Sequence, residues 1–407
     1  MDKYLIVIGG GILQVPTLEV AHSMGLKVCV MDMDPNAPAG QKADAFLPVS
    51  TKDIEKAITQ AKKFANNHEV VGVYTQGCDV ELTVAKVAQA LNLPHIDIQS
   101  AHDCNNKISM RERLAKFHVA GPKFSWANTY EEAIEKAAAI GYPLVVKSID
   151  NSASRGVRII HSPTELQAAC VEAQKYSFYD KRILLEERLV GEEYSVDTVV
   201  YDGIVYPGGI SDREFDFSTE FAVQTGSVTP SKLSENIQDK MYKLMQEAAT
   251  AMGITQGAFK GDLILCDGEP KIIEITARLS GGFDSQYRKP YSFGINLIKA
   301  TIDIAIGNKL DFRDLIPRWV KYSKTVCPFP KPGKIISIDG IESLKKMPGV
   351  RNIFLNVKQG DIIPDYKHCA NRVGYIIISA DSYLSMKELE QKVLNTLLIK
   401  TEPLSHV

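Results

Sequence analysis

The 407-residue chain has almost no net charge, because 47 Lys and Arg residues face 49 Asp and Glu residues. This balance gives no electrostatic reason to expect binding to nucleic acid or to an anionic membrane surface. No apolar run approaches the roughly 20 residues that a membrane-spanning helix needs. We therefore expect no nucleic-acid partner and no membrane partner, which leaves small molecules as the ligands to consider.

The seven cysteines form no CxxC pair, and their number is odd. This pattern disfavours a disulfide framework or a zinc ribbon and is typical of reduced thiols. The apolar start, Tyr4 to Ile8, is too short for a signal peptide and runs directly into three glycines. The sequence therefore predicts a cytoplasmic protein.

The hydrophobic pattern divides the chain into three parts. Strands and helices alternate through residues 1–100, which predicts a doubly wound parallel sheet. Residues 101–310 combine helix–strand alternation with a hairpin near residues 261–276, a pattern typical of an α+β domain. Residues 311–407 follow a proline-rich entry and have a β-rich pattern. The predicted fold class is therefore mixed α/β and α+β, with a small β-rich C-terminal domain.

Gly9, Gly10 and Gly11 follow the first strand and almost match the dinucleotide-binding fingerprint, with Asp32 as the acidic residue about 20 positions later. Gln14 stands where the third fingerprint glycine should be, so helix and strand could not pack as closely as that motif requires. The pattern favours a tight strand-to-helix turn, or a small-ligand site without NAD. An NAD-dependent oxidoreductase remains an alternative.

The hairpin carries two carboxylates that would lie together. A three-residue turn at residues 267–269 would pair Cys266 with Pro270, and hence Asp262 with Glu274. Because side chains alternate along a strand, Thr276 and Arg278 would share their face. Opposed carboxylates repel each other, and a Mg²⁺ or Mn²⁺ ion between them would remove that repulsion. The alternative is a slipped register with two solvated acids.

Other segments carry charge at strand ends. Lys147 ends an apolar strand, and the small polar residues of 148–157, around Gly156, could turn backbone N–H groups toward a phosphate. A flexible hairpin with a surface lysine is the alternative. The segment from Ile183 to Tyr194 is predicted to be a strand–turn–strand with exposed charge.

These motifs, taken in order from about residue 106 to 307, resemble the ATP-binding fold of ATP-grasp enzymes. The family commonly has Asn where this chain has Thr276. The resemblance implies that ATP is bound by Lys107, Lys147, Ser152, Ser154, Gly156, Glu186, Glu187, Leu189 and Glu193. It assigns the metal ligands to Asp262, Glu274 and Thr276, and the catalytic roles to Arg278 and Lys147.

The same resemblance implies an ATP-dependent carboxylate–amine ligase that works through an acyl phosphate, with small-molecule substrates and a homodimeric assembly. A carboxylase or formyl-phosphate type enzyme is the alternative within the family. In amino-acid ligases a glutamate and a histidine stand at the positions of Gln224 and Ser227, so the amine is not defined. Further residues that could contact the substrates or form a lid are Asp212, Glu214, Asp216, Glu220, His368 and Arg372.

Overall fold

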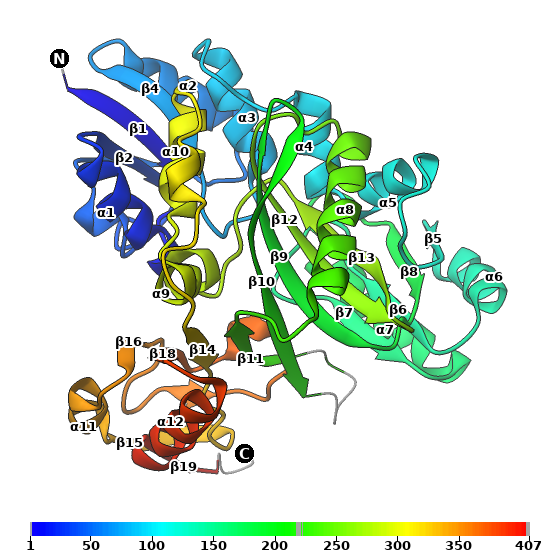
Figure 1. Cartoon of the computed structure of the whole chain (residues 1–407). Coiled ribbons are helices and arrows are strands. Elements are labelled where there is room, and N and C mark those ends of the chain that lie inside the picture. Colours follow the sequence, from blue (N-terminus) through cyan, green and yellow to red (C-terminus); the bar gives the residue numbers. More distant parts are fainter. Residues whose placement is uncertain (1, 217–220, 222, 404–407) are drawn as a thin grey trace.

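The computed structural model describes residues 2–216, 221 and 223–403. The described chain forms four β-sheets, with the N-terminal sheet at one end of the molecule and the C-terminal strands at the other (Figure 1). No helix in these ranges is both long enough and apolar enough to cross a bilayer. The mixed fold class predicted from the hydrophobic pattern is confirmed.

The N-terminal sheet is parallel throughout, with strand order β3-β2-β1-β4. Its apolar strands are buried from both sides, and Leu5, Ile6, Val7 and Ile8 are all fully buried. Its elements are β1 (Lys3–Ile8), α1 (Val15–Ser23), β2 (Lys27–Asp32), β3 (Ala45–Pro48), α2 (Ile54–Ala65), β4 (Glu69–Tyr74) and α3 (Glu81–Ala90). The helix α10 (Leu297–Ala305), far away in sequence, packs with α1 against the same sheet. The predicted parallel sheet is confirmed.

The glycine turn after β1 is closed by its own side chains. The Gly10 N–H donates to the Asp32 carboxylate at 2.7 Å, and a Cβ at Gly10 would lie 2.8 Å from Ala37 Cβ. The Gln14 side chain is buried and donates to the Gln76 carbonyl. Asp32 therefore holds the turn itself, which agrees with a tight turn rather than a dinucleotide fingerprint.

A smaller antiparallel sheet, β5-β8-β6-β7, forms a separate lobe with α6 and α7 on one face (Figure 1). Thr129 caps α6 by accepting the Glu132 N–H at 3.3 Å, as the local sequence predicts. The elements from the end of the N-terminal unit through this lobe are α4 (Ile98–Asn105), α5 (Lys107–Lys116), β5 (Phe124–Ala127), α6 (Tyr130–Ile140), β6 (Leu144–Lys147), β7 (Val157–Ile160), α7 (Leu166–Tyr176) and β8 (Ile183–Glu187).

The largest sheet has eight strands in the order β13-β12-β9-β10-β11-β14-β18-β16. The long helix α8 packs on strands β9, β10, β12 and β13 of this sheet, and the core between them includes Met241, Met245 and Phe259. The central elements are β9 (Glu192–Tyr201), β10 (Ile204–Asp216), β11 (Val223–Thr229), α8 (Glu235–Met252), β12 (Gly257–Cys266), β13 (Glu269–Thr276) and α9 (Lys289–Phe293). A single π-helical turn, Asp284–Arg288, precedes α9.

The hairpin β12–β13 differs from the expected geometry in its turn. Cys266 pairs with Glu269, so the turn has two residues, Asp267 and Gly268, both with positive φ. The Asp-Gly pair favours this tight turn over the three-residue one. The pairing of Cys266 with Pro270 was therefore wrong, but Asp262 still faces Glu274 because Ile273 is an extra residue in β13.

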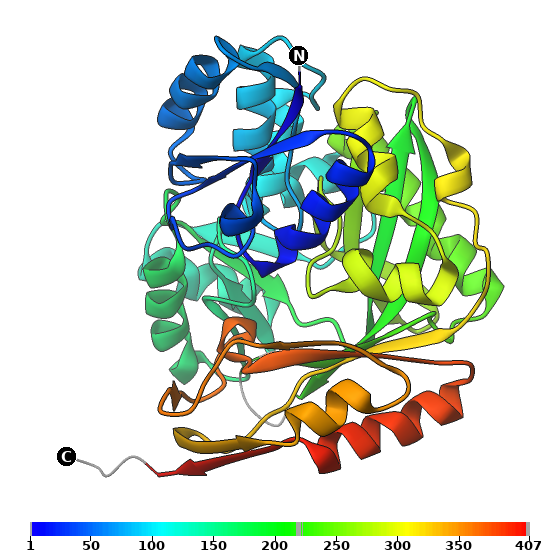
Figure 2. The same cartoon turned by 90° about the vertical axis from the view of Figure 1, so that its left-hand side faces the viewer.

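The C-terminal residues contribute to two sheets. The strands β14 (Tyr322–Val326), β16 (Val350–Leu355) and β18 (Gly374–Ala380) complete the eight-stranded sheet. A separate three-stranded sheet consists of β15 (Gly333–Asp339), β17 (Ile362–Ile363) and β19 (Leu398–Glu402). The helices α11 (Ile341–Lys346) and α12 (Tyr383–Thr396) lie along the outer side of this end of the molecule (Figure 2). The β-rich C-terminal unit thus shares its sheet with the central unit.

Candidate active site

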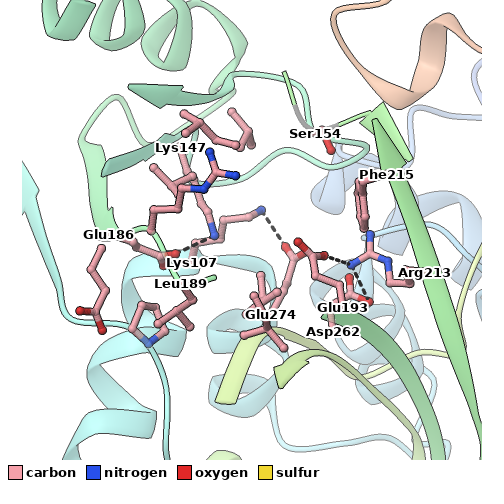
Figure 3. Close-up of a pocket in the computed structure, with 18 of the residues that line it drawn as sticks. Lys107, Lys147, Ser154, Glu186, Leu189, Glu193, Arg213, Phe215, Asp262 and Glu274 are labelled. Carbon is pink, nitrogen blue, oxygen red and sulfur yellow. Dashed lines mark hydrogen bonds and ion pairs between the residues drawn. The ribbon is translucent and has the colours of Figure 1, made fainter. Parts of the chain in front are cut away.

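A cavity of about 270 Å³ lies between the small lobe and the eight-stranded sheet. Acidic and basic side chains from both sides converge in it (Figure 3). Of the predicted nucleotide and metal residues, ten line this cavity: Lys107, Lys147, Ser152, Ser154, Glu186, Glu187, Leu189, Glu193, Asp262 and Glu274. Gly156 and Thr276 do not line it, and Arg278 lies in a neighbouring cavity.

Glu186 is the centre of a buried ion cluster on the small-lobe side. Its carboxylate lies 2.6 Å from Lys147 Nζ and 2.5 Å from Arg111 Nε, and the side chain is 3% exposed. Burial acts to raise the pKa of Glu186, but the charges of Arg111 and Lys147 outweigh it and hold the pKa below its usual value. The Glu186 side chain therefore fixes Lys147 at the end of β6, with its ammonium group on the cavity.

The loop after Lys147 curls over the cavity in an unusual conformation. Ala153 and Ser154 both have left-handed φ angles, 57° and 60°, which non-glycine residues rarely adopt. Gly156 has φ 69°, and a Cβ there would lie 2.9 Å from Tyr176 Cβ, so this position requires glycine. Gly156 thus shapes the loop, while Ser152 and Ser154 line the cavity.

Glu193 and Arg213 form the outer side of the cavity. They are cross-strand neighbours on β9 and β10, and the carboxylate lies 3.0 Å from Arg213 Nη1. The same nitrogen lies 3.3 Å from Asp262 Oδ1, which links this pair to the hairpin. Burial raises the pKa of Glu193, although Arg213 opposes the shift. Arg213 was not predicted, because its place depends on how β9 and β10 pair.

Asp262 and Glu274 lie at the inner end of the cavity, each beside a lysine. Lys260 Nζ is 2.5 Å from Asp262, and Lys107 Nζ is 2.9 Å from Glu274. Burial would raise the pKa of Glu274, but the Lys107 charge holds it well below the usual value. Glu274 therefore keeps its negative charge beside Lys107. Lys260 could have been predicted, since it stands two residues before Asp262 and so shares its face.

A second cavity, of about 340 Å³, adjoins the first and extends toward the C-terminal strands. Asp262, Glu274 and Arg213 line both cavities. Arg278 lines the second one and donates to Asp79 with a 2.7 Å bond from Nε, while Nη1 donates to the Leu279 carbonyl. Asp79 was not predicted; it lies in the loop between β4 and α3, and no local pattern marks it.

The other residues considered from the sequence have mixed positions. Gln224, Ser227 and Arg372 line the second cavity, whereas His368 lies beside Tyr176 at a ring distance of 6.0 Å. Glu214 pairs with Lys324 at 2.6 Å, and the Asp212 carbonyl accepts the Ser227 hydroxyl at 2.7 Å. The side chain of Asp216 and all of Glu220 fall outside the described residues.

Three family models match the chain in succession. They describe an ATP-grasp N-terminal domain over residues 18–95, an ATP-grasp domain over residues 104–282 and an L-amino acid ligase C-terminal domain 2 over residues 326–402. Together with the two-lobed site, they show that the chain belongs to the ATP-grasp superfamily and is an enzyme of the class that forms C–N bonds.

Within the superfamily, the chain is an ATP-dependent carboxylate–amine ligase. It is similar over 98% of its length to the crystal structure of an L-amino acid ligase from Bacillus licheniformis, with a TM-score of 0.83, 26% identity and 99% of that chain covered. Protein y4rH of Sinorhizobium fredii, itself uncharacterized, is 25% identical over 88% of this chain and 74% of its own length. Carnosine synthase 1 of Gallus gallus is 22% identical over 75% of this chain, which spans only 35% of that relative.

Proposed function

We propose that this ligase phosphorylates a small carboxylic acid with ATP and passes the acyl group to an amine, using the two adjoining cavities for the nucleotide and the acid. One observation carries this assignment: Asp262 and Glu274 line both cavities. The phosphate to be transferred and the carboxylate that receives it would therefore meet at this pair.

The first cavity suits a nucleotide. Its side walls are largely apolar, and Val145, Ile159 and Ile264 are among the residues that could face an adenine ring. Glu187 ends β8 and Leu189 follows it at the edge of the cavity, where their backbone groups could pair with the ring edge. Glu193 could accept the ribose hydroxyls. Lys147, Lys107 and the Ser152–Ser154 loop would hold the phosphates by charge-assisted hydrogen bonds.

The paired acids fit a divalent cation. Asp262 Oδ1 is buried and accepts no hydrogen bond from the described residues, and a bound cation would share this oxygen with the Arg213 nitrogen 3.3 Å away. In the same described ranges, no cluster of three or more His, Cys, Asp or Glu side chains is arranged around a common point, so phosphate oxygens would complete the coordination, as Mg²⁺ prefers. When bound, Mg²⁺ neutralises phosphate charge and aligns the transferring group. Thr276 lines a different cavity, and we do not assign it as a ligand.

The chain's own residues then supply position and charge. An oxygen of the substrate carboxylate attacks the γ-phosphorus, and the bond to the β-phosphate oxygen breaks to release ADP. Lys147 would hold the transferring phosphate, while Arg278, fixed by Asp79, would hold the carboxylate and later the developing oxyanion. The amine nitrogen then attacks the acyl carbon, phosphate leaves with the carbon–oxygen bond pair, and the nitrogen loses a proton.

ADP release tests this function directly. The protein is supplied with MgATP and with a panel of carboxylic acids crossed with amines, and products are identified by mass. Release that requires one acid–amine pair, with a product lighter than the pair by one water, supports the ligase. Release driven by bicarbonate or formate alone would favour the carboxylase or formyl-phosphate type instead, and nicotinamide absorbance changes without ADP would overturn the proposal.

We also infer a homodimer in the cytoplasm. All seven cysteines are free thiols, as a reducing compartment requires. Ile316, Trp319 and Val320 expose apolar surface on one segment that a partner subunit could cover. Light scattering of the purified chain would check the assembly, and a monomer at working concentration would contradict it.

A further inference from the structure

The second cavity ends at two arginines that the reaction above does not use. Arg288 ends the π-helical turn and is 2% exposed, and Arg372 follows a short 3₁₀ turn, Cys369–Asn371, before β18. Both line the cavity together with Thr325 of β14 and with Cys327, which follows that strand. Two guanidinium groups therefore share this cavity with residues of the C-terminal strands.

Neither arginine is fully satisfied by the protein. Arg288 pairs with Asp284 through Nη2 at 2.8 Å, but within the described residues its Nε and Nη1 have no hydrogen-bond partner. Arg372 has no acidic partner in the same part of the chain. It donates to the carbonyls of Cys369 at 2.9 Å and Gln224 at 3.4 Å, and it also contacts the Cys327 thiol and the Tyr375 ring, none of which neutralises its charge. Buried guanidinium groups are ordinarily bonded through most of their N–H groups, so this end of the cavity lacks an anion.

The acids around the cavity cannot supply that anion, because each already faces a cation. Asp79 is bonded to Arg278, Asp284 to Arg288, Asp262 to Lys260 and Glu274 to Lys107. Gln224 donates its amide N–H to the Gly226 carbonyl at 3.1 Å, and as a neutral side chain it supplies no negative charge to balance an ammonium group. Among the described lining residues, the cavity therefore has spare cationic donors and no spare carboxylate for an ammonium group.

From these contacts we infer that the acid which this enzyme activates is a dicarboxylate: one carboxylate reacts beside Arg278, and the second is bound, unreacted, by Arg288 and Arg372. This inference rests on the proposed function and adds the substrate class. A zwitterionic α-amino acid would place its ammonium group in the second cavity, beside the positive charges of Arg288 and Arg372. A monocarboxylate would leave the free N–H groups of Arg288 unsatisfied and Arg372 without a counter-charge.

Hydroxylamine makes the test independent of the natural amine, because it captures acyl phosphates as hydroxamates. Hydroxamate and ADP are measured for three acids of equal chain length, the dicarboxylate glutarate, the monocarboxylate pentanoate and the amino acid norvaline, and for shorter and longer dicarboxylates. We expect kcat/KM for the best dicarboxylate to exceed that of its monocarboxylate and amino-acid matches by at least about ten-fold, since hydrogen bonds to charged groups are strong. Equal values, or a preference for norvaline, would overturn the subsite while leaving the ligase intact.

Two variants connect the preference to the arginines. Arg288→Gln and Arg372→Gln should each bring the dicarboxylate-to-monocarboxylate ratio of kcat/KM to within roughly three-fold of one. Arg318→Gln is the matched control, because Arg318 is exposed and lies outside this cavity, and it should keep the wild-type ratio. A ratio unchanged in both variants would refute the assignment, and thermal unfolding shows whether either protein has lost its fold.

Binding gives the same answer without turnover. Calorimetry with the MgADP-saturated protein should show binding of the preferred dicarboxylate that weakens at least about ten-fold in Arg372→Gln. If no acid gives ADP but this binding is present, the proposed function fails and the subsite stands. If ADP forms but no dicarboxylate binds, the subsite fails and the function stands.

Discussion

Asp262 and Glu274 face each other across the hairpin only because Ile273 is bulged out of the ladder. Arg111, more than 160 residues away in sequence, donates to the Ile272 carbonyl at 2.9 Å and to the Ile273 carbonyl as well. The same arginine holds Glu186 on the other side of the nucleotide cavity. One buried side chain thus connects the acids of the hairpin to Lys147 in the small lobe.

The first prediction concerns the two acids. Asp262→Asn and Glu274→Gln should each lower kcat for ADP formation by at least about 100-fold, because a preorganised charge in the site is lost. Both replacements keep side-chain size but remove the charge paired with Lys260 or Lys107, so thermal unfolding is measured alongside to show that the fold persists. Glu269→Gln, at the exposed turn of the same hairpin, should keep full activity. Normal turnover in both acid variants would remove the metal assignment.

The second prediction concerns the stability of the ion cluster. Glu186→Gln would leave Arg111 and Lys147 buried without their carboxylate, which should lower the free energy of unfolding by about 3–5 kcal/mol. Urea denaturation measures this difference. Glu187→Gln should have a much smaller effect, because its half-buried side chain accepts one backbone N–H, from Lys123, and an amide oxygen can replace it. Equal losses of unfolding free energy in the two variants would show that the ion pairs of Glu186 add no special stability.

The third prediction concerns pH. Burial, followed by the nearby Asp79 charge, raises the pKa of Glu81 from 4.5 to about 7. Between these values the folded protein keeps a proton that the unfolded chain releases, so the free energy of unfolding should fall as pH rises from 4.5 to 7. The Glu81 contribution should be up to about 3 kcal/mol.

Denaturation of the wild type and of Glu81→Gln at intervals from pH 4.5 to 8 isolates this contribution. The variant should show a flatter profile in that window, because it carries no titrating carboxyl at this site. Glu247→Gln, an exposed change on α8, should retain the wild-type slope. Parallel curves for the wild type and Glu81→Gln would show that Glu81 is already ionised in the folded protein.

The fourth prediction concerns the turn between β8 and β9. A Cβ at Gly191 would lie 2.0 Å from the Leu265 carbonyl oxygen, so Gly191→Ala must push the turn away from β12. Because this turn lines the nucleotide cavity, the KM for ATP should rise by about ten-fold or more, with a loss of about 1–3 kcal/mol in stability. Val190→Ala, at the neighbouring exposed residue of the same cavity wall, adds no atom to the turn, so its effect on both values should be much smaller.

Local signals were sufficient for much of the fold. The apolar runs gave β1, β2, β4 and β6, and the Asp-Gly pair at 267–268 marks a hairpin turn. The sequence predicts that Asp262 faces Glu274 on the basis of a three-residue turn, but the turn has two residues. The two acids still face each other because the extra residue Ile273 in β13 shifts the pairing by one position. That bulge is held by Arg111 through a tertiary contact, which no local pattern can reveal.

The site was predictable where it depends on strand ends and less so where it depends on pairing. Lys147 and Glu186 belong to strands whose ends the apolar runs define. Arg213 reaches Glu193 and Asp262 through the pairing of β9 and β10, which shifts register between Pro207 and Ile210. Asp79 and Arg278 meet because the N-terminal sheet lies against the central unit, and this contact spans 199 positions in sequence.

The eight-stranded sheet has a consequence for how this protein can be cut or recombined. Residues 226–229 of β11 pair with residues 323–326 of β14, so the C-terminal unit is attached by backbone hydrogen bonds as well as by a covalent link. Ending the chain at residue 320 would turn an interior strand into an open edge, which invites pairing with other chains and aggregation. A chimera that exchanges this unit between relatives would fold only if the new strand reproduces the register of β14 along β11.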